Sequence, residues 1–159
     1  MAMEVLTLSD IGGQFLMKNK LMSSLAKMIS DEVEFVQSKQ KDDPDRPLSP
    51  EKMVRTMVKE YFTLIGTLSG NTRGISILNE TKIFSLLVPL ISSGRSDLCK
   101  VIMMSMDYSQ AGSSRVLLSK VLQNKTMPIR YLATRHLHFL LRAGAGDFKT
   151  WGIEFACKV

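Results

Sequence analysis

The chain has 159 residues, of which 45% are hydrophobic, and its 21 Lys/Arg and 15 Asp/Glu give a formal net charge of +6. One core of ordinary size is expected from this length, which argues against two full domains. No apolar run approaches the roughly 20 residues of a membrane-spanning helix, and the N-terminus lacks the basic and apolar pattern of a secretion signal. We therefore expect a soluble, cytoplasmic protein.

The positive charge is concentrated in the C-terminal part of the chain. Residues 1–70 contain 9 Lys/Arg and 10 Asp/Glu, whereas residues 71–159 contain 12 Lys/Arg and 5 Asp/Glu. Such a surplus is typical of proteins that meet acidic partners, whether protein, phosphate or membrane surface, so peripheral membrane contact stays open. Basic side chains scattered over solvated helix faces give the same count, and that is the simplest interpretation.

Helical spacing of apolar residues begins near the N-terminus. Over residues 14–36 they recur at steps of three and four, which predicts N-terminal helices within residues 1–37. The segment that follows is polar, contains Pro44 and Pro47, and has almost nothing to bury. Because little compensates for the entropy of ordering such a segment, we predict a mobile polar linker over residues 38–49.

The next helix has a well-marked start. Ser49 can accept hydrogen bonds from the first free amides, Pro50 has no amide proton to satisfy, and Glu51 suits the positive end of the helix dipole. An apolar stripe over residues 53–68 predicts one helix of about five turns, ended by left-handed residues at Gly70-Asn71. Ser49, beside the predicted linker, is also a candidate phosphorylation site, because a phosphate is favourable at a helix N-terminus.

Shorter amphipathic segments occupy the rest of the chain. Thr72 and Thr81 are placed to cap two of them, and Pro89 is expected to bend or shorten the second. Residues 126–128, Thr-Met-Pro, predict the start of a longer helix, which we expect to end in the glycine-rich turn at residues 144–146. Every predicted segment is a helix.

Strands are not expected, because no stretch alternates with period two and no Asn-Gly or Asp-Gly pair joins β-branched runs. Gly74, Gly112 and Gly152 lie 38 and 40 residues apart, close to the period of about 40–47 residues in armadillo and HEAT repeats. We therefore predict an all-α fold, a fragment of an armadillo/HEAT-like helical repeat (α-solenoid). Residues 50–159 are the helical-repeat segment of the same domain as the N-terminal helices.

The reactive side chains do not form a recognisable catalytic or metal-binding set. His136 and His138, two residues apart, point to different sides of a helix and cannot share a metal, so we interpret both as surface or rim residues. Cys99 and Cys157 are expected to be reduced, buried or half-buried thiols. Nucleotide-binding, nucleophile-elbow and zinc-protease motifs are absent from the sequence. We predict no enzyme activity, and no catalytic, cofactor-binding or metal-binding residue.

One helix face is a candidate binding surface. Arg135, His138 and Arg142 follow i, i+3, i+7 spacing opposite the apolar stripe of the helix near residues 128–142, with Arg130 nearby. A solvated face is the first interpretation, docking of an acidic protein segment the second and phosphate binding the third. Aromatic residues do not alternate with these charges, which disfavours nucleic acid. The alternative function is nevertheless a phosphate- or nucleic-acid-binding helical-repeat module that uses the basic C-terminal part.

Over roughly residues 14–154 the chain closely resembles the middle region of the Rictor/Pianissimo family. The segments that carry the resemblance are residues 61–70 (YFTLIGTLSG) with Arg73-Gly74, 105–108 (SMDY), 115–120 (RVLLSK), 132–137 (LATRHL), 141–143 (LRA) and 151–154 (WGIE). The resemblance implies a non-catalytic scaffold that assembles proteins in the second TOR kinase complex. Its implied partners are TOR kinase complex subunits and flanking parts of a longer Rictor-like chain. The similarity stops at residues 155–159, so we expect a truncated or excised form.

Overall fold

The structure, a computed structural model, describes residues 10–38, 43–144 and 147–157. All regular structure in these ranges is helical, which confirms the predicted all-α class. The helices are α2 (Asp10–Lys18), α3 (Leu21–Ser38), α4 (Pro50–Arg55), α5 (Val58–Ser69), α6 (Thr72–Glu80), α7 (Ile83–Ser92), α8 (Ser96–Ser105), α9 (Ser113–Leu122), α10 (Met127–Ala143) and α11 (Phe148–Ala156). Residues 39–42 of the predicted linker lie outside the described ranges.

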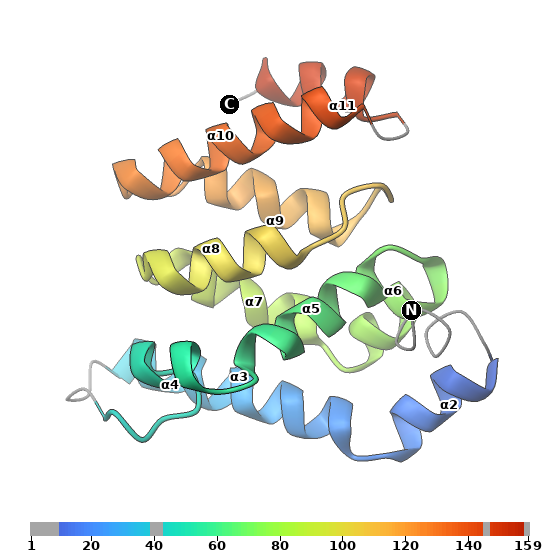
Figure 1. Cartoon of the computed structure of the whole chain (residues 1–159), viewed down its shortest axis with the longest axis vertical. Coiled ribbons are helices and arrows are strands. Elements are labelled where there is room, and N and C mark those ends of the chain that lie inside the picture. Colours follow the sequence, from blue (N-terminus) through green and yellow to red (C-terminus); the bar gives the residue numbers. More distant parts are fainter. Residues whose placement is uncertain (1–9, 39–42, 145–146, 158–159) are drawn as a thin grey trace.

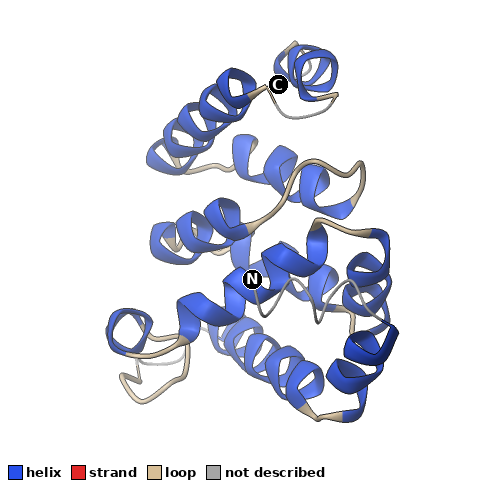
Figure 2. Cartoon of the chain, turned by 45° about the vertical axis from the view of Figure 1, so that its right-hand side comes forward, coloured by secondary structure: helices blue, strands red, loops and turns tan. Residues whose placement is uncertain are grey.

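The helices stack in two columns along the long axis of the molecule (Figure 1). One column consists of α5, α8 and α10, and the other consists of α3, α7 and α9. Contacts of α7 with α8, α8 with α9 and α9 with α10 join the columns, and α11 packs on α10 at the C-terminal end. Figure 2 shows that helices make up most of the described chain, with loops and turns between them. This arrangement confirms the predicted armadillo/HEAT-like helical-repeat fragment.

A single hydrophobic core runs through both columns. Every helix from α3 to α10 contributes at least one buried apolar side chain, so each pair of neighbouring helices shares part of the core. Burying one such side chain stabilises the fold by about 1.5–3 kcal/mol, and that gain exists only while the neighbouring helix is in place. The fully buried apolar side chains include Ile29, Phe62, Ile65, Leu68, Leu87, Leu90, Ile91, Ile102, Leu118 and Ile129.

Two glycines allow helix backbones to approach closely. A Cβ on Gly66 would lie 1.7 Å from the carbonyl oxygen of Ser105, so the backbones of α5 and α8 can approach this closely only because residue 66 has no side chain. A Cβ on Gly74 would lie 2.0 Å from the carbonyl oxygen of Leu68, at the turn from α5 into α6. The spacing of one column therefore depends on Gly66.

The prediction of one long helix after Pro50 is wrong, because the segment forms two helices, α4 and α5. The break is at Thr56, whose backbone is extended and whose hydroxyl donates to the carbonyl of Lys52 at 2.7 Å. Met53 and Val58 are both buried, although five residues of continuous helix would place them on different faces. The break brings both into the core and leaves Met57, which belongs to the predicted apolar stripe of residues 53–68, 66% exposed.

Three predicted turns differ in the structure. Gly70 has φ −82, so α5 does not end in a left-handed residue. Asn71, rather than Thr72, caps α6, since its side chain accepts a backbone amide hydrogen bond at 2.7 Å. Thr81 ends α6 instead of capping α7, and the left-handed residue of this turn is Lys82, with φ 58.

Other predicted helix ends are confirmed. The Ser49 hydroxyl accepts from the amide of Lys52 at 3.3 Å at the start of α4, and Pro50 is the first helical residue. Gly144 is left-handed, with φ 67, at the end of α10. Pro89 lies inside α7, but the helix continues to Ser92, so this proline does not end it.

Within the described ranges, no single helix is long and apolar enough to cross a membrane. The helices α6 and α7 meet the requirement for length and composition only as a pair, and this pair is bent by 76°.

Candidate interaction surface

The two histidines of α10 have different surroundings. His138 is exposed, as predicted, whereas His136 is half-buried, with its ring centroid 5.7 Å from that of Tyr108 and 6.4 Å from that of Phe139. Burial lowers the pKa of His136, and its Nε2 atom is buried without a hydrogen-bond partner. Across the described ranges, His, Cys, Asp and Glu side chains do not gather in any group of three or more that could bind a metal.

The two cysteines are free thiols in different environments. Cys99 is buried, as expected, and its Sγ donates to the carbonyl of Ile91 at 3.3 Å. Burial raises the pKa of Cys99 to about 11, so the group stays a thiol near neutral pH and is a poor nucleophile. Cys157 is exposed, and the expectation that it is buried or half-buried is wrong.

A buried ion-pair cluster connects three segments at the N-terminal end of the stack. Glu32 of α3 is buried, and its Oε1 accepts hydrogen bonds from Arg46 at 2.5 Å and from Arg95 at 2.6 Å. Arg95 also donates to the carbonyl of Leu48 at 2.9 Å and pairs with Asp97. Burial acts to raise the pKa of Asp97, but the hydrogen bond and charge of Arg95 outweigh it and lower the pKa. We call Glu32, Arg46 and Arg95 the Glu32 cluster.

The C-terminal end of the predicted linker packs against this cluster. Leu48 is fully buried, and Ser49 is 1% exposed, with its hydroxyl donating to the carbonyl of Pro44 at 2.8 Å. A kinase could reach the Ser49 hydroxyl only if residues 46–49 left this position. Phosphorylation of Ser49 therefore stays a prediction, and it requires local opening.

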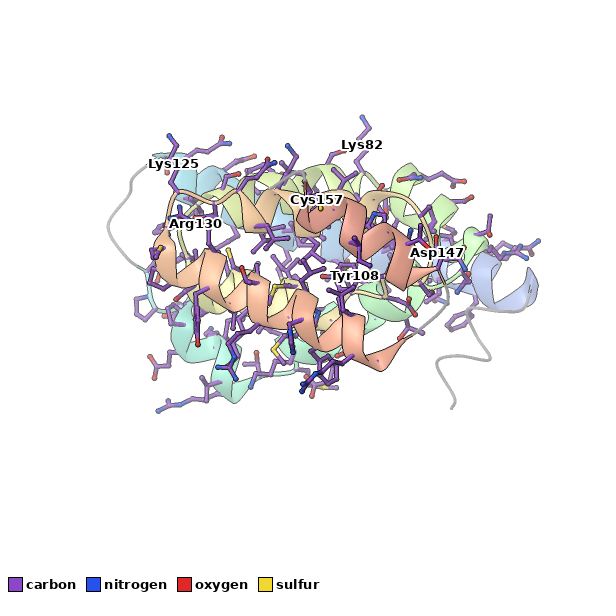
Figure 3. The ribbon with its side chains drawn as sticks, turned by 90° about the horizontal axis from the view of Figure 1, so that it is seen from above. Lys82, Tyr108, Lys125, Arg130, Asp147 and Cys157 are labelled. Atoms are coloured by element: carbon purple, nitrogen blue, oxygen red, sulfur yellow. The ribbon has the colours of Figure 1, made fainter. Side chains whose placement is uncertain are left out.

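A second buried charged side chain, Arg115, connects α9 with Asp147 directly before α11. Arg115 is buried and donates to the carbonyls of Tyr108 and Ser109, both at 3.0 Å, and to the Asp147 carboxylate at 2.5 and 3.1 Å. Its guanidinium carbon lies 4.7 Å from the ring centroid of Trp151. The hydrogen bond from Arg115 lowers the pKa of Asp147. Figure 3 labels Tyr108 and Asp147, which Arg115 joins, and we call this set the Arg115 cluster.

The structure places three of the four predicted basic-face residues together. Arg135, His138 and Arg142 are exposed on α10, which contains no Asp or Glu from Met127 to Ala143. Arg130 is half-buried and donates to the carbonyls of residues 124 and 125, at 2.8 and 3.1 Å, in the turn before α10. Arg130 therefore stabilises that turn, and Figure 3 shows it at the end of α10 near Lys125.

Beside this face, a groove of about 420 Å³ lies between α8 and α10. Two apolar side chains in its walls are open to solvent: Phe139 is 66% exposed and Met104 is 58% exposed. Arg135 contributes to both the basic face and the groove. The residues that line the groove are Lys100, Met103 and Met104 of α8 and Leu132, Arg135, His136 and Phe139 of α10.

The sequence-based prediction found the basic residues but not this groove. Its only signal in the sequence is that Met104 and Phe139 lie off the apolar stripes of their helices, at positions where a polar residue is expected. The groove itself forms only when α8 and α10 pack together. Its lining combines apolar side chains with two cationic ones, Lys100 and Arg135.

Comparisons with known proteins give the family of the chain. The sequence model of the family described as "Rapamycin-insensitive companion of mTOR, middle domain" matches residues 37–141. The chain is similar to Protein pianissimo A of Dictyostelium discoideum, with 43% identity over 163 residues, 96% of this chain and 14% of that protein. It is also similar to Rapamycin-insensitive companion of mTOR of Homo sapiens, with 37% identity over 131 residues, 82% of this chain and 8% of that protein.

A third relative is Target of rapamycin complex 2 subunit ste20 of Schizosaccharomyces pombe, with 26% identity over 146 residues, 90% of this chain and 11% of that protein. The chain thus spans 14% or less of the length of these three relatives. The family match extends from the end of α3 into α10, so it includes helices α4 to α9 and most of α10. The chain belongs to the Rictor/Pianissimo family and corresponds to its middle domain.

Proposed function

We propose that the chain is a non-catalytic helical scaffold segment that mediates protein–protein assembly in a TOR kinase complex. The observation that carries this proposal is the family match, which covers the stacked helices of residues 37–141. One relative is named as a subunit of target of rapamycin complex 2, and another as a companion of mTOR. We also propose a cytoplasmic location for the chain, in keeping with these partners.

The stack supports this role through its shape and through its exposed side chains. In a helical repeat, each unit covers the apolar face of its neighbour, so the outer helices, α3 at the N-terminal end and α11 at the C-terminal end, are where flanking parts of a longer Rictor-like chain would pack. Exposed aromatic residues and arginines are the usual anchors of protein interfaces. Tyr131 is 65% exposed on α10, with the guanidinium carbon of Arg135 6.0 Å from its ring centroid.

Affinity purification tests the proposal. The 159-residue chain and a longer family protein that contains it would each be tagged and recovered from cells, and copurified TOR-complex subunits would be measured. We expect the longer protein to recover the kinase, and the chain alone to recover less, since it spans 14% or less of its relatives. Deleting the region of α8–α11 from the longer protein should reduce recovery. Full recovery after this deletion would contradict the proposal.

The exposed face of α10 supports one alternative, a phosphate- or nucleic-acid-binding module. Arg135, His138 and Arg142 are exposed on a helix without carboxylates, as phosphate binding requires. A salt titration separates the two functions, because binding through phosphate contacts weakens steeply as salt increases. Loss of all RNA and DNA binding near physiological salt would remove the alternative.

A further inference from the structure

The side chains that line the groove between α8 and α10 indicate what kind of partner would bind there. Phe139, Met104 and Met103 form an apolar surface between the helices, and two of these side chains are more than half exposed. Exposed aromatic and methionine side chains gathered in a groove are typical of protein-binding surfaces. An occupant must therefore present apolar side chains to the groove.

The charge of the groove is positive and not neutralised by its own helices. Lys100 contributes from the α8 side and Arg135 from the α10 side. The ion pairs of the described residues leave both without a carboxylate partner. Of the acids on α8 and directly after it, Asp97 pairs with Arg95, and Asp107 accepts from the amide of Ser109 at 2.7 Å. The complementary occupant is acidic.

His136 adds a polar group to the α10 wall. Its Nε2 atom is buried without a hydrogen-bond partner, and burial disfavours its protonation. A buried polar nitrogen without a partner is costly, so this atom marks an unsatisfied polar site in the α10 wall. The groove therefore offers two charges and an apolar surface, with one unsatisfied imidazole nitrogen buried in its wall.

From these features we propose that the groove binds an acidic amphipathic helix of a partner protein. This inference rests on the proposed scaffold function and specifies the chemistry of one partner. A groove of about 420 Å³ holds a few side chains rather than a whole ligand, as when apolar residues at i, i+4 and i+7 of a helix enter a groove. Apolar side chains of the helix contact Phe139 and Met104, and its carboxylates pair with Lys100 and Arg135.

A designed probe tests the site directly. The probe is a fluorescein-labelled, side-chain-stapled helix with leucines at i, i+4 and i+7 and glutamates along both flanks, and its binding is measured by fluorescence anisotropy. Phe139→Ser and Arg135→Glu should each weaken binding at least about tenfold, since each removes an anchor of the interface. Both side chains are exposed, so the fold should persist, and circular dichroism would check this.

Matched control variants come from α9, in the other column. Val116→Ser and Lys120→Glu make the same kinds of change at exposed positions away from the groove, and should leave probe affinity unchanged. A probe with serine in place of leucine, and one with lysine in place of glutamate, should both bind at least about tenfold more weakly. Met104→Ser is a second variant in the groove if Phe139→Ser unfolds.

Several outcomes would overturn the proposal. The first is failure of the probe to bind the wild-type chain. The second is a groove variant that binds the probe as tightly as the control variants do. The third is an altered probe that binds the wild-type chain as tightly as the original probe does. Binding of phosphatidylserine vesicles or inorganic phosphate without binding of the probe would also overturn it. So would self-association in analytical ultracentrifugation that Phe139→Ser abolishes, because the occupant would then be a second copy. A negative probe result leaves the copurification result standing, so failure here differs from failure of the scaffold function.

Discussion

The two ends of the stack are each stabilised by a buried charge, but the charges have opposite signs and different partners. Glu32, 2% exposed, accepts hydrogen bonds from the side chains of Arg46 and Arg95. Arg115 is also buried, but two of its acceptors are backbone carbonyls, and its carboxylate partner Asp147 is 61% exposed. The N-terminal end therefore depends on side-chain charge, whereas the C-terminal end depends more on backbone geometry.

The largest decrease in the free energy of unfolding is expected for Glu32→Ala. This change leaves Arg46 and Arg95 facing each other in a buried site without the carboxylate that both of them bind. Breaking a buried ion pair costs about 3–5 kcal/mol, and we expect a loss of that size in the free energy of unfolding. Urea unfolding followed by circular dichroism measures it.

The matched control for this change is Glu51→Ala. Glu51 and Arg55 form an exposed pair at 2.8 Å on α4, and such pairs contribute about 0–1 kcal/mol. If Glu32→Ala lowers the free energy of unfolding no more than Glu51→Ala does, the N-terminal end does not depend on its buried charge.

Arg115→Met should cause the next largest decrease in the free energy of unfolding. The methionine retains most of the buried stem but leaves the carbonyls of Tyr108 and Ser109 without their donors, which costs about 1–3 kcal/mol. Amide hydrogen exchange should accelerate in the turn between α8 and α9 and at the start of α11. If hydrogen exchange accelerated only in α3 and in the residues before α4, Arg115 would not be what stabilises the C-terminal end of the stack.

Asp147→Asn should have a smaller effect than Arg115→Met. The carboxylate is mostly exposed, and Arg115 keeps its two backbone acceptors when Asp147 loses its charge. A double-mutant cycle between Arg115→Met and Asp147→Asn measures the coupling between them. A coupling as large as the whole effect of Arg115→Met would show that charge, rather than backbone geometry, stabilises this end as well.

Much of the fold follows from local patterns in the sequence. The start of α4 depends on Ser49 and Pro50, and the end of α10 depends on Gly144, so neighbouring residues suffice to predict them. The break at Thr56 could not be predicted in this way. It arises because Met53 and Val58 both enter a core formed by residues distant in sequence, and no local pattern contains that requirement.

The candidate surface was predicted only in part, for the same reason. The i, i+3, i+7 spacing of Arg135, His138 and Arg142 identified the exposed face of one helix. The groove could not be predicted because its other wall is α8. The Glu32 cluster could not be predicted because Arg46 and Arg95 lie 14 and 63 residues from Glu32 in the sequence.

The smallest expected effect is a pH dependence at the C-terminal end, which comes from His136. Burial lowers the pKa of His136 below its ordinary value of 6.5, so the unfolded chain takes up a proton before the folded chain does. Stability is therefore complete above about pH 6.5 and is lost as the pH falls through the folded pKa. His136→Phe removes this proton uptake and keeps a ring against Tyr108 and Phe139.

Urea midpoints at about pH 7.5 and pH 5.5 should differ more for the wild-type chain than for His136→Phe, while the exposed His138→Phe should keep the wild-type difference. His136 packs on Tyr108, whose carbonyl is bound by Arg115, so hydrogen exchange on acidification should accelerate first in α9 and α10. If hydrogen exchange accelerated equally in α3, the two ends would open together. The difference between their buried charges would then not determine where the stack opens.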